Sequence, residues 1–148
     1  MKPLNEFKLA FQSSSSNESF ARIAVSGFLA QYDPTVDELS DIKTVVSEAV
    51  TNCIVHAYRN HLATVYITVK YFDGDRVTIS VRDVGCGIPD VKQAMEPLFS
   101  SDPGGERAGL GFTVMQSFMD KISVRSKPGR GTTVTLTKRF AKRTFSND

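Results

Sequence analysis

A long amphipathic run that begins at Thr35 most constrains how this chain can fold. Apolar residues recur along it at helical spacing, among them Ile42, Val46 and Ala49. Thr35 followed three residues later by Glu38 is the pattern of a capping box, in which each side chain accepts a hydrogen bond from the other residue's backbone N–H. The run therefore predicts a central helix of more than 20 residues with one face in the core.

Three polar side chains interrupt the apolar part of this helix. Glu48, Asn52 and His56 are spaced four residues apart, so they form one stripe along the helix. Polar groups held against a core are costly unless they have partners. The stripe either satisfies itself and the nearby backbone, or it faces a polar ligand, and the spacing alone leaves both open.

Alternation of apolar and polar residues predicts five strands, with a tight Asp73–Gly74 turn between the second and the third. The strands are residues 7–12, 64–72, 76–82, 121–126 and 132–139. Shorter helices are predicted over residues 90–95 and 112–118. The helices cluster in sequence and the strands pair as hairpins. This order predicts an α+β fold, a two-layer sandwich with helices on one face of a mixed, mainly antiparallel sheet.

Another helix is predicted before the central one, capped by Ser16 or Asn17 and running to about residue 32. Glu18 and Arg22 share its polar face at the i, i+4 spacing of an ion pair. The pair is either a local surface contact or part of a protein-binding surface.

Composition excludes several classes of protein. The 148 residues suit one domain, which we place at residues 1–140 with a flexible basic tail at 141–148. Eighteen basic and 16 acidic residues give a net charge of +2, too balanced for a protein that binds nucleic acid or a membrane surface. Cys53 and Cys86 match no metal-ligand spacing. Without a signal-like or membrane-spanning run, we expect a cytoplasmic location.

The first glycine-containing motif is Asp83-x-Gly85-x-Gly87, at the end of the third predicted strand. The Asp83 carboxylate would lie at the rim of the sheet, where it could accept a hydrogen bond from an exocyclic amine such as that of adenine. The glycines would let the backbone turn sharply and let a flat ligand approach. The same pattern also occurs in ordinary turns.

A second motif, Gly109-Leu110-Gly111, opens the helix predicted at residues 112–118. Free N–H groups at a helix N-terminus suit phosphate, and Arg107 could add a positive charge beside a terminal phosphate. No GxxxxGK[ST] motif is present, so this is not a P-loop. Asn52 offers a carbonyl oxygen to Mg²⁺, and Glu48, one turn earlier, is placed to take a proton from an attacking hydroxyl.

These motifs in this order resemble the GHKL (Bergerat-fold) ATP-binding proteins, which include gyrase, Hsp90, MutL and histidine kinases. Residues 48–57 resemble the N-box, and the two glycine motifs resemble the glycine boxes. Gly131-Thr132-Thr133 resembles the last box, where a threonine hydroxyl assists the aspartate that binds adenine. The resemblance implies that ATP and Mg²⁺ are the cofactors.

Longer runs, such as SEAVTNCIVHAY and GLGFTVMQSFMD, resemble the anti-sigma-F group of that family over nearly the whole chain. This resemblance implies a homodimeric protein-serine kinase with two mutually exclusive partners, a sporulation sigma factor and an anti-anti-sigma protein that it phosphorylates on serine. Glu48 would be the general base and Arg107 would approach the γ-phosphate. The residues of the nucleotide site would be Asn52, which also holds the metal, Asp83, Gly85, Gly87, Gly109, Leu110, Gly111 and Thr132. Glu18 and Arg22 are our candidate sigma contacts, and Glu106 our candidate contact to the anti-anti-sigma protein.

Two residues depart from the pattern of that group. Asp102 stands in the polar segment before the second glycine motif, where a basic residue is expected, and an acid there would weaken support for phosphates. Cys86 is an unusual residue between two glycines.

Several alternatives compete with this reading. A histidine kinase would need a phosphoacceptor histidine before the domain, and the two histidines present, His56 and His61, lie in or just after the central helix. A gyrase-type ATPase would need a further domain. An antagonist and kinase of a stress-response sigma-B system, and a sigma-sequestering module without chemistry, both stay open.

Overall fold

The computed structural model describes residues 1–96 and 111–141. Its strands are β1 (Asn5–Gln12), β2 (Thr64–Phe72), β3 (Arg76–Asp83), β4 (Lys121–Lys127) and β5 (Gly131–Arg139). Its helices are α1 (Ser16–Ala30), α2 (Val36–Asn52), the π-helical segment η1 (Cys53–Ala57), α3 (Val91–Ala94) and α4 (Phe112–Phe118).

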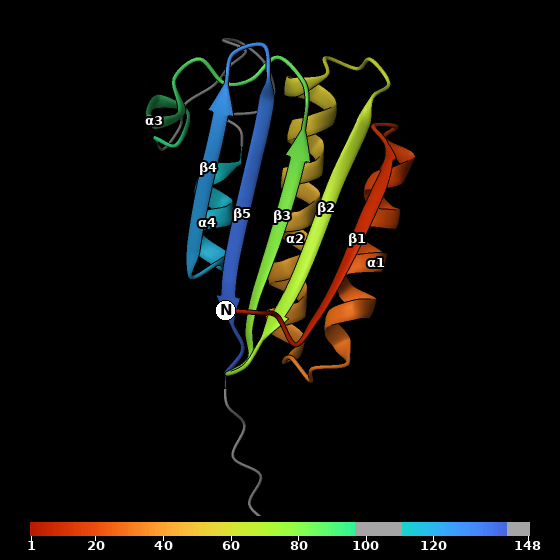
Figure 1. Cartoon of the computed structure of the whole chain (residues 1–148), viewed down its shortest axis with the longest axis vertical. Helices are drawn as coiled ribbons and strands as arrows, with labels where there is room; N and C mark the ends of the chain where they lie inside the picture. Colours follow the sequence, from red (N-terminus) through yellow and green to blue (C-terminus); the bar gives the residue numbers. More distant parts are fainter. Residues whose placement is uncertain (97–110, 142–148) are drawn as a thin grey trace, which may run out of the picture.

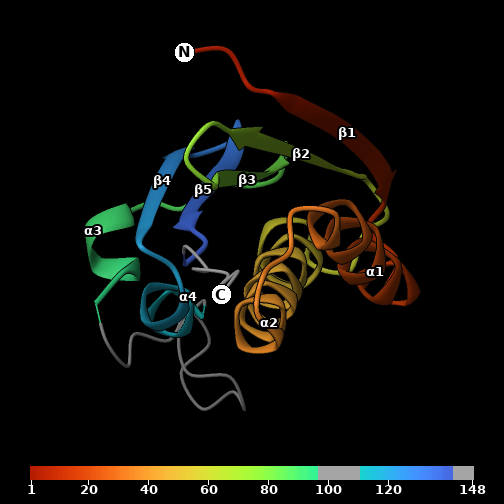
Figure 2. The ribbon, with the colours of Figure 1, turned by 90° about the horizontal axis from the view of Figure 1, so that it is seen from below.

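The five strands form one sheet in the order β1-β2-β3-β5-β4, and all four neighbouring pairs are antiparallel. Helices α1, α2 and α4 lie on the same face of this sheet, and its other face is uncovered by helices in the described part of the chain (Figures 1 and 2). The predicted two-layer α+β sandwich is therefore confirmed. The described sheet contains no parallel pair, so it is antiparallel throughout rather than mixed.

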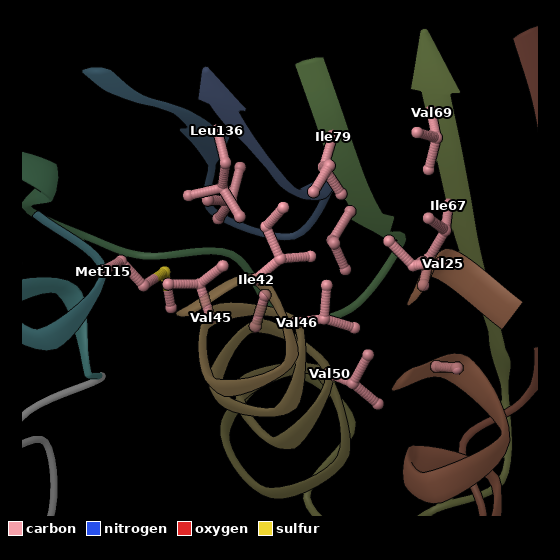
Figure 3. Packing of buried hydrophobic residues seen from close by; sticks show 14 of the residues in the cluster. Val25, Ile42, Val45, Val46, Val50, Ile67, Val69, Ile79, Met115 and Leu136 are labelled. Carbon is pink, nitrogen blue, oxygen red and sulfur yellow. The ribbon is translucent and has the colours of Figure 1, made fainter. Parts of the chain in front are cut away.

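The core lies between the sheet and α2, as the alternation along the strands requires. Ile42 and Val46 of α2 point toward the sheet, whereas Val45 lies on the side of α4 and Val50 on the side of α1 (Figure 3); all four are fully buried. They meet inward-facing side chains from three strands and from the flanking helices. These partners are Val25, Ile67, Val69, Ile79, Met115 and Leu136.

The start of α2 has the predicted capping box. The Thr35 hydroxyl accepts a hydrogen bond from the Glu38 N–H at 3.0 Å, and the Glu38 carboxylate accepts one from the Thr35 N–H at 2.8 Å. The other Glu38 oxygen accepts from the N–H of Ala141 at 2.8 Å, which ties the chain after β5 to this helix. Burial raises the pKa of Glu38, but these hydrogen bonds outweigh it, so the pKa lies below its usual value.

The start of α1 differs from the prediction. Its N-cap is Ser15, whose side chain makes no capping hydrogen bond. The Asn17 side chain instead donates to the carbonyl of Gln12 at 2.9 Å, and the Ser16 hydroxyl bonds to that of Ser14 at 2.8 Å. These polar side chains therefore fix the turn between β1 and α1 rather than capping the helix.

The end of α2 also departs from a regular helix. From Cys53 to Ala57 the backbone is π-helical, and the N–H of Tyr58 donates to the carbonyl of Cys53 at 2.9 Å, five residues back. Single π turns of this kind are rare and occur mostly at functional sites. Among the described residues, no helix has the length and apolar character needed to cross a membrane.

The capping box predicts a measurable loss of stability on substitution. Thr35→Ala removes the acceptor for the Glu38 N–H and should lower the free energy of unfolding by about 1 kcal/mol, measured by denaturant unfolding. Thr44→Ala is the matched control, because the Thr44 hydroxyl only bonds back to the carbonyl of Ser40 within the same helix. Equal losses in the two variants would show that the cap does not stabilise α2.

Candidate functional site

A pocket lies where the end of α2 and η1 meet β3, β5 and α4. Its walls are mostly apolar and its polar groups come from three separate segments. The apolar lining is Ala49, Cys53, Ala57, Val81, Ile88, Phe112 and Val134. The polar lining is Asn52, His56, Asp83 and Thr132, with Gly87 at the loop that follows β3. Such a pocket, apolar with a few convergent polar groups, is typical of a small-molecule site.

Asp83 is the charged group of this pocket and is only 5% exposed. Its Oδ1 accepts hydrogen bonds from the backbone N–H of Gly85 at 3.0 Å and of Thr132 at 3.2 Å. Burial raises the pKa of Asp83, while hydrogen bonds from Gly85, Cys53 and Thr132 and the charge of Arg82 oppose the rise. Two fixed backbone donors on one oxygen hold the carboxylate in a set orientation.

Cys53 does more than fill the core. Burial and the adjacent Asp83 carboxylate raise the pKa of the Cys53 thiol well above its usual range, so the thiol stays protonated. It donates a hydrogen bond to Asp83. The sequence gives no sign of this hydrogen bond, because a thiol in an apolar run does not reveal its polar partner.

Gly85 and Gly87 allow close approach of protein backbone. A Cβ at Gly85 would lie 2.4 Å from the carbonyl oxygen of Ala57, and one at Gly87, where φ is +77°, would lie 2.2 Å from that of Lys127. Between them, the N–H of Cys86 donates to the carbonyl of Ala57 at 3.1 Å. The glycines thus seat this loop against η1 on one side and the β4–β5 turn on the other.

Ser126 was not anticipated from the sequence, although it makes three hydrogen-bonding contacts beside the pocket. Its hydroxyl accepts from the N–H of Ile88 at 2.7 Å, lies 3.0 Å from the carbonyl oxygen of Gly131, and lies 2.8 Å from the Thr132 hydroxyl. The sequence signal for it is the alternation along the strand, which places Ser126 on the same inward face of β4 as Ile122 and Val124.

The polar stripe, which runs from α2 into η1, is divided between two places. Asn52 and His56 line the pocket. Glu48 lies against Gly111, the N-cap of α4, where an added Cβ would come 2.3 Å from the Glu48 carboxylate oxygen Oε2. Gly111 has a φ of +74°. The structure therefore brings the polar stripe and the end of the second glycine motif together.

The remaining predicted site residues fall elsewhere. Arg107, Gly109, Leu110 and Glu106 lie outside the described residues, as does Asp102. Glu18 and Arg22 form the expected ion pair on α1, with Arg22 Nε 3.4 Å from the Glu18 carboxylate, and neither residue lines the pocket. The Ser47 hydroxyl of α2 donates to the same carboxylate, so Glu18 also joins the two helices.

Comparison with known proteins identifies the kind of domain. The model of the histidine kinase-like ATPase domain matches residues 12–138. Anti-sigma F factors are similar over nearly the full length. That of Thermoanaerobacter sp. (strain X514) is 55% identical over 139 residues, covering 93% of this chain and 96% of its own. That of Bacillus licheniformis is 53% identical over 139 residues, covering 93% of this chain and 94% of its own.

Solved structures show the same fold at low identity. The RsbU and RsbW domains of a Mycobacterium tuberculosis protein match with a TM-score of 0.69 and 17% identity, covering 95% of this chain and 34% of that one. The catalytic domain of the histidine kinase ThkA matches with a TM-score of 0.53 and 15% identity, covering 93% of this chain and 97% of that one.

The close contact at Gly87 predicts a steric cost that a matched glycine does not share. Gly74, in the β2–β3 turn, also has a positive φ of +80°, but an added Cβ would meet nothing within 4 Å. Gly74→Ala should therefore cost only the left-handed strain, about 1–2 kcal/mol. Gly87→Ala should cost about 1–3 kcal/mol more, measured by denaturant unfolding. Equal losses would mean that the loop does not pack against Lys127 as described.

Asp83 should lower the stability of the ligand-free protein. Because its pKa is raised in the folded state, folding is favoured by the protonated form, and this contribution is lost as pH rises through the raised pKa. The neutral variant Asp83→Asn should therefore be at least as stable as the wild type at pH 7 in thermal unfolding. Asp73→Asn, in the exposed β2–β3 turn, is the control. Marked destabilisation by Asp83→Asn alone would contradict this account.

Proposed function

The chain belongs to the anti-sigma F factor family within the histidine kinase-like ATPases, and from this premise we propose that it is an ATP-dependent protein-serine kinase that also sequesters a sigma factor. The observation that carries the proposal is the buried carboxylate of Asp83, oriented by two backbone N–H groups at the base of an apolar pocket. Asn52 lies in the same pocket and Glu48 lies one helical turn before it.

The pocket fits the base of ATP. A flat base suits the apolar walls formed by residues such as Val81, Ile88 and Val134. The Asp83 carboxylate is an acceptor only, so it would take a hydrogen bond from the exocyclic amine of adenine. Thr132, on the adjacent strand, would complete this edge of the site, and Gly85 and Gly87 would hold the loop beside it.

Asn52 and Glu48 would serve the phosphate end of the nucleotide. Mg²⁺ usually keeps several waters and takes few protein ligands, so one amide oxygen from Asn52 together with phosphate oxygens is a suitable set. Glu48 would take the proton of the partner's serine hydroxyl as its oxygen attacks the terminal phosphorus and ADP leaves. When bound, ATP supplies the phosphoryl group, and the chain supplies position and the base.

The family resemblance supports the remaining assignments. Arg107 would approach the γ-phosphate, and Gly109, Leu110 and Gly111 would line the phosphate site. We assign Glu18 and Arg22 to the sigma factor and Glu106 to the anti-anti-sigma protein, and we propose a homodimer. On α1, Ile23 is 70% exposed and Phe20 is 46% exposed beside this charged pair, which is consistent with a protein-binding surface.

Two narrower alternatives use the same domain. One is an antagonist and kinase of a stress-response sigma-B system, which would differ in partner and not in chemistry. The other is a module that sequesters sigma without catalysis. The presence of both Glu48 and Asn52 beside the pocket favours a catalytic protein over this second alternative.

The role of Glu48 predicts a separation of binding from chemistry. Glu48→Gln should bind ATP with affinity close to that of the wild type, but should lose at least about 100-fold in phosphotransfer, the contribution typical of a general base. The assay is transfer of label from γ-labelled ATP with Mg²⁺ to a serine of a purified anti-anti-sigma protein. Glu6→Gln, at the β1 edge and paired with Lys70, is the matched control and should keep full activity.

Undiminished transfer by Glu48→Gln would exclude Glu48 as the base. The same assay is run with the anti-anti-sigma protein of a sigma-F system and with that of a sigma-B system. ATP binding by the wild type with no label on either protein would support the non-catalytic module. Label on the anti-anti-sigma protein of the sigma-B system alone would assign the chain to the stress-response system.

A further inference from the structure

Ser126 connects three backbone segments at the side of the pocket. It lies near the end of β4, and its hydroxyl contacts the loop after β3 through Ile88 and the start of β5 through Gly131 and Thr132. No other described residue joins that loop to the start of β5 through a side-chain hydroxyl. The position of the Thr132 side chain therefore depends on Ser126.

Proton counting fixes the direction of these hydrogen bonds. A serine hydroxyl has one proton to donate and two lone pairs to accept. The N–H of Ile88 can only donate and the carbonyl of Gly131 can only accept, so the Ser126 proton goes to Gly131. Its second lone pair then accepts the proton of the Thr132 hydroxyl. This is the one assignment in which all three contacts are hydrogen bonds.

These directions determine how the Thr132 hydroxyl can bind a ligand. Because its proton is given to Ser126, the Thr132 hydroxyl can act toward a ligand only as an acceptor. Thr132 is 8% exposed and lines the pocket together with Asp83, whose carboxylate is also an acceptor. This edge of the pocket therefore presents acceptors only, which suits a ring edge that carries an amine.

We propose that Ser126 is a positioning residue that determines base specificity, since it holds Thr132 as an acceptor so that the pocket accepts a 6-amino purine and rejects a 6-keto purine. The inference deepens the nucleotide-binding function proposed above and rests on it. A 6-keto base places an acceptor where the amine would be, so its oxygen would face both the Asp83 carboxylate and the Thr132 oxygen with no proton between them. A buried polar group left without a partner is costly.

Removal of Ser126 should relax this discrimination. In Ser126→Ala the Thr132 proton is released, so the hydroxyl can donate to the O6 atom of an inosine base, whose N1–H can donate to Asp83. The ratio of the dissociation constants for ITP and ATP should fall by about tenfold, the factor supplied by one ordinary hydrogen bond. Both nucleotides are titrated against the full chain by calorimetry with Mg²⁺ present.

Matched variants separate this role from a merely structural one. Ser123→Ala, on the outward face of the same strand, should leave the ratio unchanged. Ser126→Thr keeps the hydroxyl and should retain discrimination. Thr132→Val removes the acceptor without removing the Ile88 contact, so it should lower the ratio by itself, and adding Ser126→Ala to it should lower the ratio no further.

The outcomes distinguish this inference from the function on which it rests. A wild type that binds neither nucleotide would overturn the proposed function and the inference together. A wild type that prefers ATP, with the same ratio in Ser126→Ala or Thr132→Val, would overturn the inference alone. If Ser126→Ala does not fold, Thr132→Val and Ser126→Thr decide the question.

Discussion

The burial of one carboxylate, that of Asp83, is the interaction on which the site depends. A buried charge is tolerated only when hydrogen bonds replace its water, and here the donors come from the loop after β3, from β5 and from η1. Each donor belongs to a different element, so the carboxylate keeps its orientation only when all three are assembled. The geometry of the site is in this sense a property of the whole sandwich rather than of the motif that contains Asp83.

The π turn at the end of α2 makes that assembly possible. The carbonyl of Ala57 is free to accept a hydrogen bond from the N–H of Cys86 in the loop after β3, since the helix does not continue past Tyr58. The Tyr58 hydroxyl then accepts from the N–H of Val84 at 2.8 Å, immediately after Asp83. The end of the central helix and the loop after β3 are therefore joined by one main-chain hydrogen bond and by one from a backbone N–H to the Tyr58 side chain.

The sequence predicted what depends on local pattern. Alternation located the strands, the Thr35 and Glu38 pair located the start of α2, and the first glycine motif located the loop after β3 beside the pocket. It could not predict what depends on a distant partner. Nothing near Ser126 indicates that its hydroxyl meets Ile88, 38 residues away. The π turn was not predicted either; in the structure its last residue, Ala57, lies against the backbone of Gly85, 28 residues further along the chain.

The structure gives Gly85 and Gly87 a different role from the one that the sequence predicted. Gly85 and Gly87 were expected to make room for a ligand, but their missing Cβ atoms make room for backbone carbonyls of the chain itself. Packing of the loop and the proposed ligand binding therefore follow from different atoms within one motif. The glycines hold the loop against η1 and the β4–β5 turn, whereas burial of Asp83 raises its pKa, so that its ionised form costs free energy of folding. A substitution in this motif is informative about function only when its effect on folding has been measured separately.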